Sequence, residues 1–142
     1  MLRIILVRHG QTEWNKDAHF RGRIDIKLNP TGITQAQSVA DQLASLQISA
    51  VYASPLKRAI ETAAPIAAAQ KLEVIPFAGL LDIDYGQWGG RQFGEVAEQW
   101  PGLYRQWDTT PHLVRIPGGE SLDDVLQRVR NGLEKILQDH DQ

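Results

Sequence analysis

The chain opens with a nearly unbroken run of apolar residues, Leu2 to Val7, that leads directly into the polar triplet Arg8-His9-Gly10. A short run of branched apolar residues predicts a strand that is buried on both faces, as in a parallel sheet. In open parallel sheets, ligands bind beyond the carboxyl ends of the strands. The run therefore predicts an α/β fold and puts an arginine and a histidine where such a fold builds its binding site.

Strand and helix patterns alternate along the rest of the chain. They predict strands at 50–53 and 73–76, and helices at 31–46, 56–70 and 121–138. Pro65 should kink the second helix or begin a new segment, because proline lacks an amide donor and crowds the preceding turn. Residues 8–29 are polar and predict a long loop with one helical turn. Alternation of this kind favours a mainly parallel sheet.

Residues 79–119 differ from the rest of the chain, because glycine and proline interrupt them repeatedly. We interpret them as an insertion with short helices that covers a site. The helix after them begins with Ser121 and Asp124, a capping-box pattern. The length of 142 residues fits a single domain, 1–142. Four aromatic side chains of the insertion fit a core better than a substrate pocket: Trp88, Trp100, Tyr104 and Trp107.

Composition narrows the classes of function. The chain carries 15 basic and 17 acidic residues and a formal net charge of −2, so no basic excess points to nucleic acid or to an anionic membrane. No apolar run approaches the roughly 20 residues that span a bilayer. There is no cysteine, which excludes disulfides, thiolate metal sites and a cysteine nucleophile. We expect a cytoplasmic protein.

Two predicted strands end in residues suited to phosphate. Arg8 follows the first strand and Arg58 the second, and each offers a guanidinium fork that matches phosphate oxygens. Gly10 lets the backbone turn sharply and approach an anion, and Asn15 adds a neutral donor. An imidazole between two guanidinium groups is expected to be neutral and nucleophilic. Taken singly, His9 is more often a structural residue and Arg58 a solvated charge, so the interpretation depends on the combination.

Longer motifs extend this pattern. They are Leu6-Val7-Arg8-His9-Gly10-Gln11-Thr12-Glu13-Trp14-Asn15, Phe20-Arg21-Gly22-Arg23-Ile24-Asp25, Leu28-Asn29-Pro30-Thr31-Gly32, Ser54 to Ala63, and Pro117-Gly118-Gly119-Glu120-Ser121. In this order and at roughly this spacing, they resemble the signature of the histidine phosphatase (phosphoglycerate-mutase-like) superfamily over essentially the whole chain. The resemblance implies a three-layer α/β/α fold with a mainly parallel sheet.

The resemblance also implies a reaction through a phosphohistidine. His9 would attack phosphorus, while Arg8, Arg58 and Asn15 would hold the phosphate oxygens. The other residues expected to contact the substrate are Gly10, Gln11, Thr12, Arg21 and Gly22. The partner would be a small phosphorylated metabolite or inorganic phosphate.

A general acid must protonate the leaving oxygen. The family places this group, usually Glu, before a Gly-aromatic pair, and within residues 81–88 Asp82 takes that position. Asp84 is the weaker candidate, and a turn cap is the alternative role for Asp82. The resemblance implies no cofactor and no metal. The remaining histidines, His19, His112 and His140, do not show metal-ligand spacing.

The family's second essential histidine lies in a strand after the last helix, and the sequence stops before such a strand. We therefore expect a C-terminally incomplete domain: a truncated piece, a naturally shortened relative, or a domain that a partner completes. Open sheet edges invite pairing, so a homodimer is a further expectation. The functions left open are, in order, a phosphomonoesterase, a phosphate-binding module without turnover, and a phosphoglycerate mutase.

Overall fold

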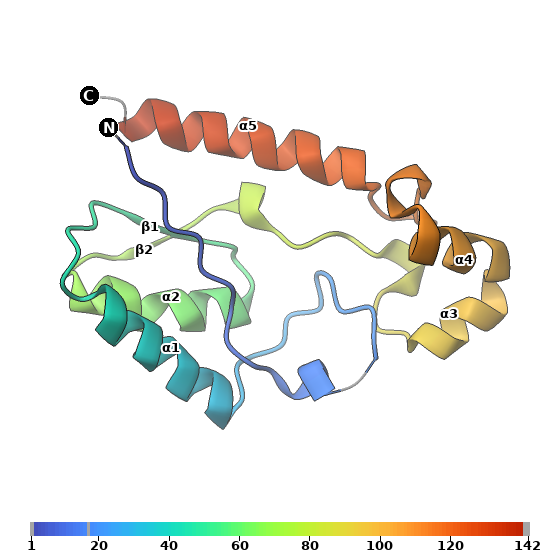
Figure 1. Cartoon of the computed structure of the whole chain (residues 1–142), viewed down its shortest axis with the longest axis horizontal. Coiled ribbons are helices and arrows are strands. Elements are labelled where there is room, and N and C mark those ends of the chain that lie inside the picture. The colour runs from blue at the N-terminus through green and yellow to red at the C-terminus, as the bar shows by residue number, and fades with distance from the viewer. Residues whose placement is uncertain (1, 17, 141–142) are drawn as a thin grey trace. The chain divides into compact units, whose positions relative to one another are not determined.

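The computed structural model describes residues 2–16 and 18–140, which form two compact units (Figure 1). Residues 2–16 and 25–81 belong to the first unit, and residues 18–24 and 82–140 to the second. The short loop at 18–24 is therefore distant in sequence from the rest of its unit. That the two units together form a single domain over 1–142 stays a prediction.

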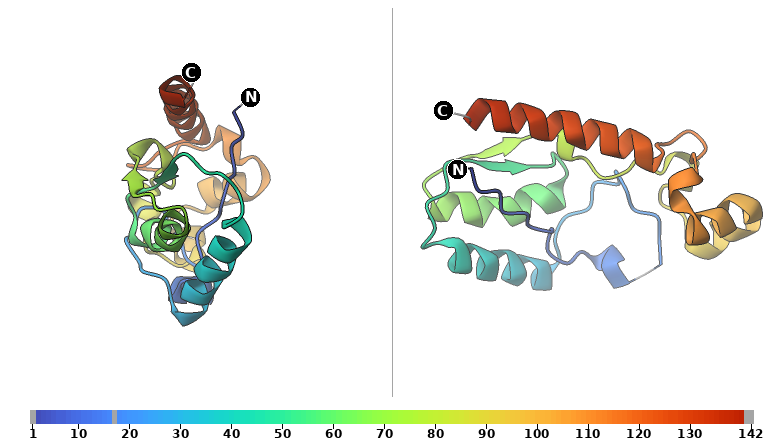
Figure 2. Two further views of the ribbon diagram at one scale, coloured as in Figure 1. Left: turned by 90° about the vertical axis from the view of Figure 1, so that its left-hand side faces the viewer. Right: turned by 45° about the horizontal axis from the view of Figure 1, so that its top comes forward.

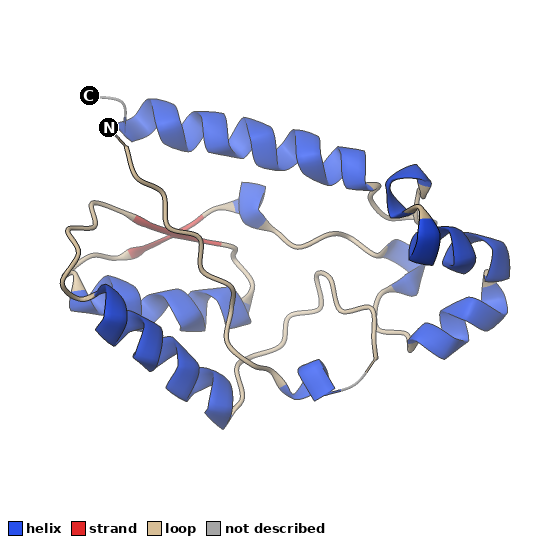
Figure 3. Ribbon diagram, viewed as in Figure 1, coloured by secondary structure: helices blue, strands red, loops and turns tan. Residues whose placement is uncertain are grey.

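The first unit contains a parallel two-stranded sheet. Strand β1 (Val51–Ala53) pairs with β2 (Val74–Pro76), with Val51 opposite Val74. Helix α2 (Lys57–Ala69) connects the two strands and packs against both, and the connection can be followed in Figure 3. The strands predicted at 50–53 and 73–76 and their parallel pairing are confirmed.

Helix α1 (Pro30–Leu43) begins with a capped turn. The Oδ1 atom of Asn29 accepts a hydrogen bond from the amide of Gly32 at 2.8 Å, and proline suits the first helical position because it has no amide to satisfy. Helix α1 packs along α2 (Figures 1 and 2). Half of the residues that the two helices bury are alanines, which allow a close approach. Helix α2 continues through Pro65, so the prediction of a new segment there is wrong, while the alternative of a kink stays a prediction.

Residues 2–7 form no strand in the part of the chain that the structure describes, so the first predicted strand is wrong. Their apolar side chains are exposed, with Leu6 at 86%. A strand requires a neighbouring strand that supplies carbonyls and amides, and the described sheet consists of β1 and β2, which bond to each other. Apolar residues become a buried strand only where another strand pairs with them and another layer of the fold covers their side chains.

The second unit is built around a buried aromatic and aliphatic cluster. Its helices are α3 (Phe93–Gln99), α4 (Pro101–Thr109) and α5 (Leu122–His140), with short 3-10 turns at Gly86–Trp88 and Pro111–Leu113. The core residues are Phe20, Ile83, Trp88, Val96, Val114 and Ile116, and Trp100, Tyr104 and Trp107 pack against them. The predicted short helices and the core role of the aromatic residues are confirmed. A covering role for 79–119 stays a prediction.

Helix α5 starts with the predicted capping box. The amide of Asp124 donates to Ser121 Oγ at 3.2 Å, and the amide of Ser121 donates to Asp124 Oδ2 at 2.9 Å. The helix extends to His140, two residues beyond its predicted end at residue 138. Among residues 2–16 and 18–140, none of the helices combines the length and the apolar character that a membrane crossing needs.

Candidate functional site

His9 has a defined ring orientation. Its Nδ1 lies 2.8 Å from the carbonyl oxygen of Gly10. Because a carbonyl oxygen only accepts hydrogen bonds, Nδ1 carries the proton of the neutral ring, and the lone pair then lies on Nε2. The ring is half-buried. In this arrangement Nε2 is the nitrogen that can act as a nucleophile.

Gly10 is fixed by a close backbone approach. A Cβ at this position would lie 2.5 Å from the carbonyl oxygen of Gly32, in the first turn of α1. The reverse holds as well, since a Cβ on Gly32 would lie 2.1 Å from the carbonyl oxygen of Gln11. Neither position can carry a side chain without a backbone shift. The two glycines thus seat the loop after His9 on the start of α1.

Thr62 joins the same loop to α2. The amide of Gly10 donates to Thr62 Oγ1 at 3.0 Å, and this hydroxyl donates to the carbonyl of Arg58 at 2.7 Å. Arg58 lies in the first turn of α2 and is 5% exposed, so it is not a solvated surface charge. Arg8, by contrast, is exposed. The structure brings His9, Gly10 and the first turns of α2 together through Thr62.

The next residues of the loop support one another. Asn15 Oδ1 accepts from both the amide and the hydroxyl of Thr12, each at 2.7 Å, and Thr12 is buried. Gln11 Oε1 accepts from Asn29 Nδ2 at 2.9 Å, and its amide donates to Gln35 Oε1 at 2.8 Å. Both Gln11 and Thr12 therefore have structural contacts. The Nδ2 group is the part of Asn15 that can donate to an anion.

Asp82, Arg21 and Gly22 belong to the second unit. Asp82 is exposed, and its Oδ1 accepts the amide of Ile83 at 2.8 Å. Gly22 has a φ of 48°, and a Cβ there would lie 2.4 Å from the carbonyl oxygen of Ile83. Burial, together with the nearby charge of Asp82, raises the pKa of Tyr85, while the Arg21 guanidinium opposes that rise. These residues gather around the backbone of 82–85.

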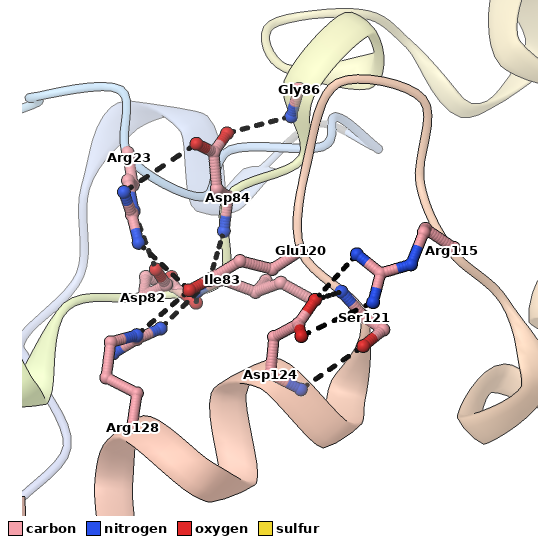
Figure 4. A network of polar contacts seen from close by, with 10 residues as sticks. All are labelled: Arg23, Asp82, Ile83, Asp84, Gly86, Arg115, Glu120, Ser121, Asp124 and Arg128. Atoms are coloured by element: carbon pink, nitrogen blue, oxygen red, sulfur yellow. Dashed lines mark hydrogen bonds and ion pairs between the residues drawn. The ribbon is translucent and has the colours of Figure 1, made fainter.

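A network of charged groups surrounds the same backbone (Figure 4). Glu120 accepts from Arg128 through two bonds of 2.9 Å and from Arg23 at 3.2 Å. It also accepts the amide of Asp84 at 3.0 Å. The Arg128 hydrogen bonds lower the pKa of the Glu120 carboxyl most strongly, with smaller contributions from Asp84 and Arg23. Glu120 is thus an ionised acceptor at the centre of the network.

Sequence reasoning quoted Thr62 and Glu120 within longer motifs but gave them no role. Each acts on residues distant in sequence, 52 positions for Thr62 and Gly10, and 36 for Glu120 and Asp84. Spacing within one motif carries no signal for such contacts. Within the residues that the structure describes, no three acidic or histidine side chains converge as metal ligands would.

Comparison with known proteins agrees with the motifs. Residues 4–142 match the family model described as histidine phosphatase superfamily (branch 1). The chain is 41% identical over 140 residues to phosphoserine phosphatase 1 of Hydrogenobacter thermophilus, an alignment that covers 99% of this chain and 66% of that protein.

Two solved structures share the fold. Bacillus stearothermophilus YhfR superposes with a TM-score of 0.88 at 28% identity, covering 94% of this chain and 66% of that chain. The mycobacterial glucosyl-3-phosphoglycerate phosphatase Rv2419c gives 0.86 at 29% identity, covering 93% and 62%. These matches confirm the predicted α/β fold class. The chain spans about two thirds of the length of these relatives.

Proposed function

Because the chain belongs to the histidine phosphatase superfamily, we propose that it carries the phosphohistidine site of a phosphomonoesterase acting on a small phosphorylated metabolite. The observation that carries the proposal is the orientation of His9. Its Nδ1–H is held by the carbonyl of Gly10 at 2.8 Å, so Nε2 keeps the lone pair that attack on phosphorus requires.

The first step transfers the phosphoryl group to the protein. The Nε2 lone pair of His9 forms a bond to phosphorus, the bond from phosphorus to the ester oxygen breaks, and its electron pair stays on that oxygen. Asp82 gives the oxygen a proton, so an alcohol leaves. Arg8, Arg58 and Asn15 donate to the phosphoryl oxygens and stabilise the charge in the transition state.

The second step returns the histidine to its starting state. Water attacks phosphorus and gives a proton to the Asp82 carboxylate, while the nitrogen–phosphorus bond breaks and its electron pair returns to Nε2. The sum of both steps is hydrolysis of a phosphate ester to an alcohol and inorganic phosphate. The hydrogen bond from the Ile83 amide to Asp82 Oδ1 at 2.8 Å supports this double role, because it holds the carboxyl in one orientation.

The remaining proposed substrate contacts divide between the phosphoryl group and the leaving group. Gly10, Gln11 and Thr12 are the proposed contacts of the phosphoryl group, and Arg21 and Gly22, in the same unit as Asp82, are the proposed contacts of the leaving group. Phosphoserine is the first metabolite to try, because the relative with 41% identity is named phosphoserine phosphatase 1.

Hydrolysis of p-nitrophenyl phosphate from acid to neutral pH tests the proposal. We expect His9→Ala to lower kcat by about 10³-fold or more, because it removes the nucleophile. His112→Ala is the matched control: this histidine is exposed in a 3-10 turn of the second unit, and its loss should leave the rate unchanged. Equal rates for wild type and His9→Ala would refute the phosphohistidine route. A folded wild type that binds inorganic phosphate without releasing p-nitrophenol would favour the phosphate-binding module.

A further inference from the structure

We infer that Glu120 is a positioning residue that holds the backbone of 82–84, and thereby the proposed acid Asp82, in place. The motif Pro117-Gly118-Gly119-Glu120 contacts this backbone directly, and the function proposed above does not use it. The inference rests on that proposed function for the role of Asp82, whereas the contact itself is a property of the second unit alone.

The backbone contact is made in both directions. The amide of Glu120 donates to the carbonyl of Asp84 at 2.8 Å, and the amide of Asp84 donates to Glu120 Oε2 at 3.0 Å. The amide of Gln87 donates to the carbonyl of Pro117 at 2.9 Å. These three bonds join the turn before α5 to the segment that follows Asp82.

The glycines of the motif allow this proximity. A Cβ on Gly119 would lie 2.3 Å from the carbonyl oxygen of Asp84, and a Cβ on Gly86 would lie 2.4 Å from backbone atoms of Pro117, Gly118 and Gly119. Gly118 itself has a φ of 68°, a conformation that favours glycine. The turn is therefore shaped to meet residues 84–86 at backbone distance.

One arginine, Arg23, links Glu120 to the main chain of Asp82. A second, Arg128, holds the Glu120 carboxylate. Arg128, on helix α5, binds both carboxylate oxygens of Glu120 at 2.9 Å, and the Glu120 side chain is 18% exposed. Arg23 binds Glu120 at 3.2 Å and Asp84 at 3.6 Å, and its Nε donates to the carbonyl of Asp82 at 3.4 Å. Figure 4 shows these groups converging on 82–84. Glu120 thus fixes the main chain on which the Asp82 carboxyl is mounted.

Position matters for a general acid, because proton transfer requires the donor within hydrogen-bond reach of the leaving oxygen. The effect depends on the leaving group. p-Nitrophenolate departs readily without a proton, whereas an alkoxide does not. Misplacement of Asp82 should therefore slow hydrolysis of an alkyl phosphate such as phosphoserine far more than hydrolysis of p-nitrophenyl phosphate. A general loss of structure would slow both alike.

The experiment compares Glu120→Ala with Asp82→Asn and Asp124→Ala on both substrates. Asp124→Ala is the matched control, since its carboxylate accepts from the Ser121 amide and from Arg115, each at 2.9 Å, and these partners lie outside 82–84. We expect Asp82→Asn to lower kcat on phosphoserine by about 10²-fold or more, and Glu120→Ala by about tenfold or more, with a much smaller change on p-nitrophenyl phosphate. Glu120→Gln keeps one acceptor oxygen and should restore part of the rate.

Amide hydrogen exchange of the full chain gives a second readout that needs no turnover. The Asp84 amide should exchange faster in Glu120→Ala than in wild type or Asp124→Ala. Equal exchange at Asp84, or equal rate losses on both substrates, would overturn the positioning role. If wild type hydrolyses neither ester, the proposed function fails for this chain. Hydrogen exchange of the Asp84 amide then tests only whether Glu120 holds the backbone of 82–84. If Asp82→Asn shows the difference between substrates and Glu120→Ala does not, only the present inference fails.

Discussion

The two units bury different kinds of side chain. In the second unit, Trp88 and Val96 are fully buried in an aromatic and aliphatic cluster, although Leu126 on α5 is 65% exposed. In the first unit, Leu6 is 86% exposed and Ile75 in β2 is 41% exposed. The second unit closes its core with side chains from its own turns and helices, whereas the first contains a sheet of two strands. The difference shows that an apolar pattern produces burial only where the chain also supplies the covering layer.

The largest expected effect is in the closed core of the second unit. Trp88→Ala should lower the free energy of unfolding by about 3–5 kcal/mol, because it leaves a cavity that neighbouring rings cannot fill. Trp88→Phe should cost much less, since it keeps a ring and removes a buried Nε1–H for which the described residues offer no hydrogen-bond partner. Urea unfolding followed by circular dichroism measures both. Similar losses for the two variants would contradict the closed-core description.

The second effect concerns the loop that holds His9 in the first unit. Gly10→Ala should destabilise the chain by about 1–3 kcal/mol, because the new Cβ would lie 2.5 Å from the Gly32 carbonyl oxygen. Activity on p-nitrophenyl phosphate should fall with it. Gly102→Ala in α4 is the matched control, since no atom lies within 4 Å of a Cβ at that position, and it should be neutral or stabilising by up to about 1 kcal/mol. Equal effects of both substitutions would show that the contact with Gly32 is not tight.

A smaller loss of stability is expected for Glu120→Gln in the charged network, and this loss should depend on pH because it involves an ionised group. The pKa of Glu120 is lowered in the folded chain, mainly by Arg128. Between the folded and unfolded pKa values the unfolded chain binds more protons, so stability rises with pH there. The ionised Glu120 carboxylate thus adds to the free energy of unfolding above its pKa in the unfolded chain. This addition is lost as the pH falls through its pKa in the folded chain. The stability difference between wild type and Glu120→Gln should shrink from neutral to acid pH in urea titrations, and a constant difference would show that the charge of Glu120 does not matter.

The smallest effect is expected at the exposed run of the first unit. Leu6→Ser should change stability by no more than about 0.5 kcal/mol, because the side chain is already 86% exposed. Light scattering of wild type and Leu6→Ser at high concentration then tests the predicted pairing between copies. A wild type that is monomeric throughout would count against the homodimer. A stability loss as large as that of Trp88→Ala would show that Leu6 is buried in solution.

Local sequence signals predicted much of the helical structure and the family. Ser121 with Asp124 marked the start of α5, because capping depends on groups a few positions apart. The Asn29 cap of α1 has the same local character but was not predicted. The motifs around His9 and Arg58 indicated the histidine phosphatase superfamily for the same local reason. The aromatic residues of 79–119 were assigned to a core from their size and composition, and Trp88 is its centre.

Contacts between distant segments could not be predicted in this way. Nothing near Gly10 in sequence specifies Thr62 or Gly32, and nothing near Asp82 specifies Glu120, because these contacts exist only once the chain has folded. The same limit explains the failure of the strand at 2–7, where the predicted burial is wrong as well, since Leu6 is 86% exposed. Sequence by itself determined the capped start of α5 and the family to which the chain belongs, since both follow from short-range spacing within motifs. Tertiary structure alone decided which backbone supports His9 and Asp82, since a hydrogen-bond partner or a neighbouring strand is a matter of position in space.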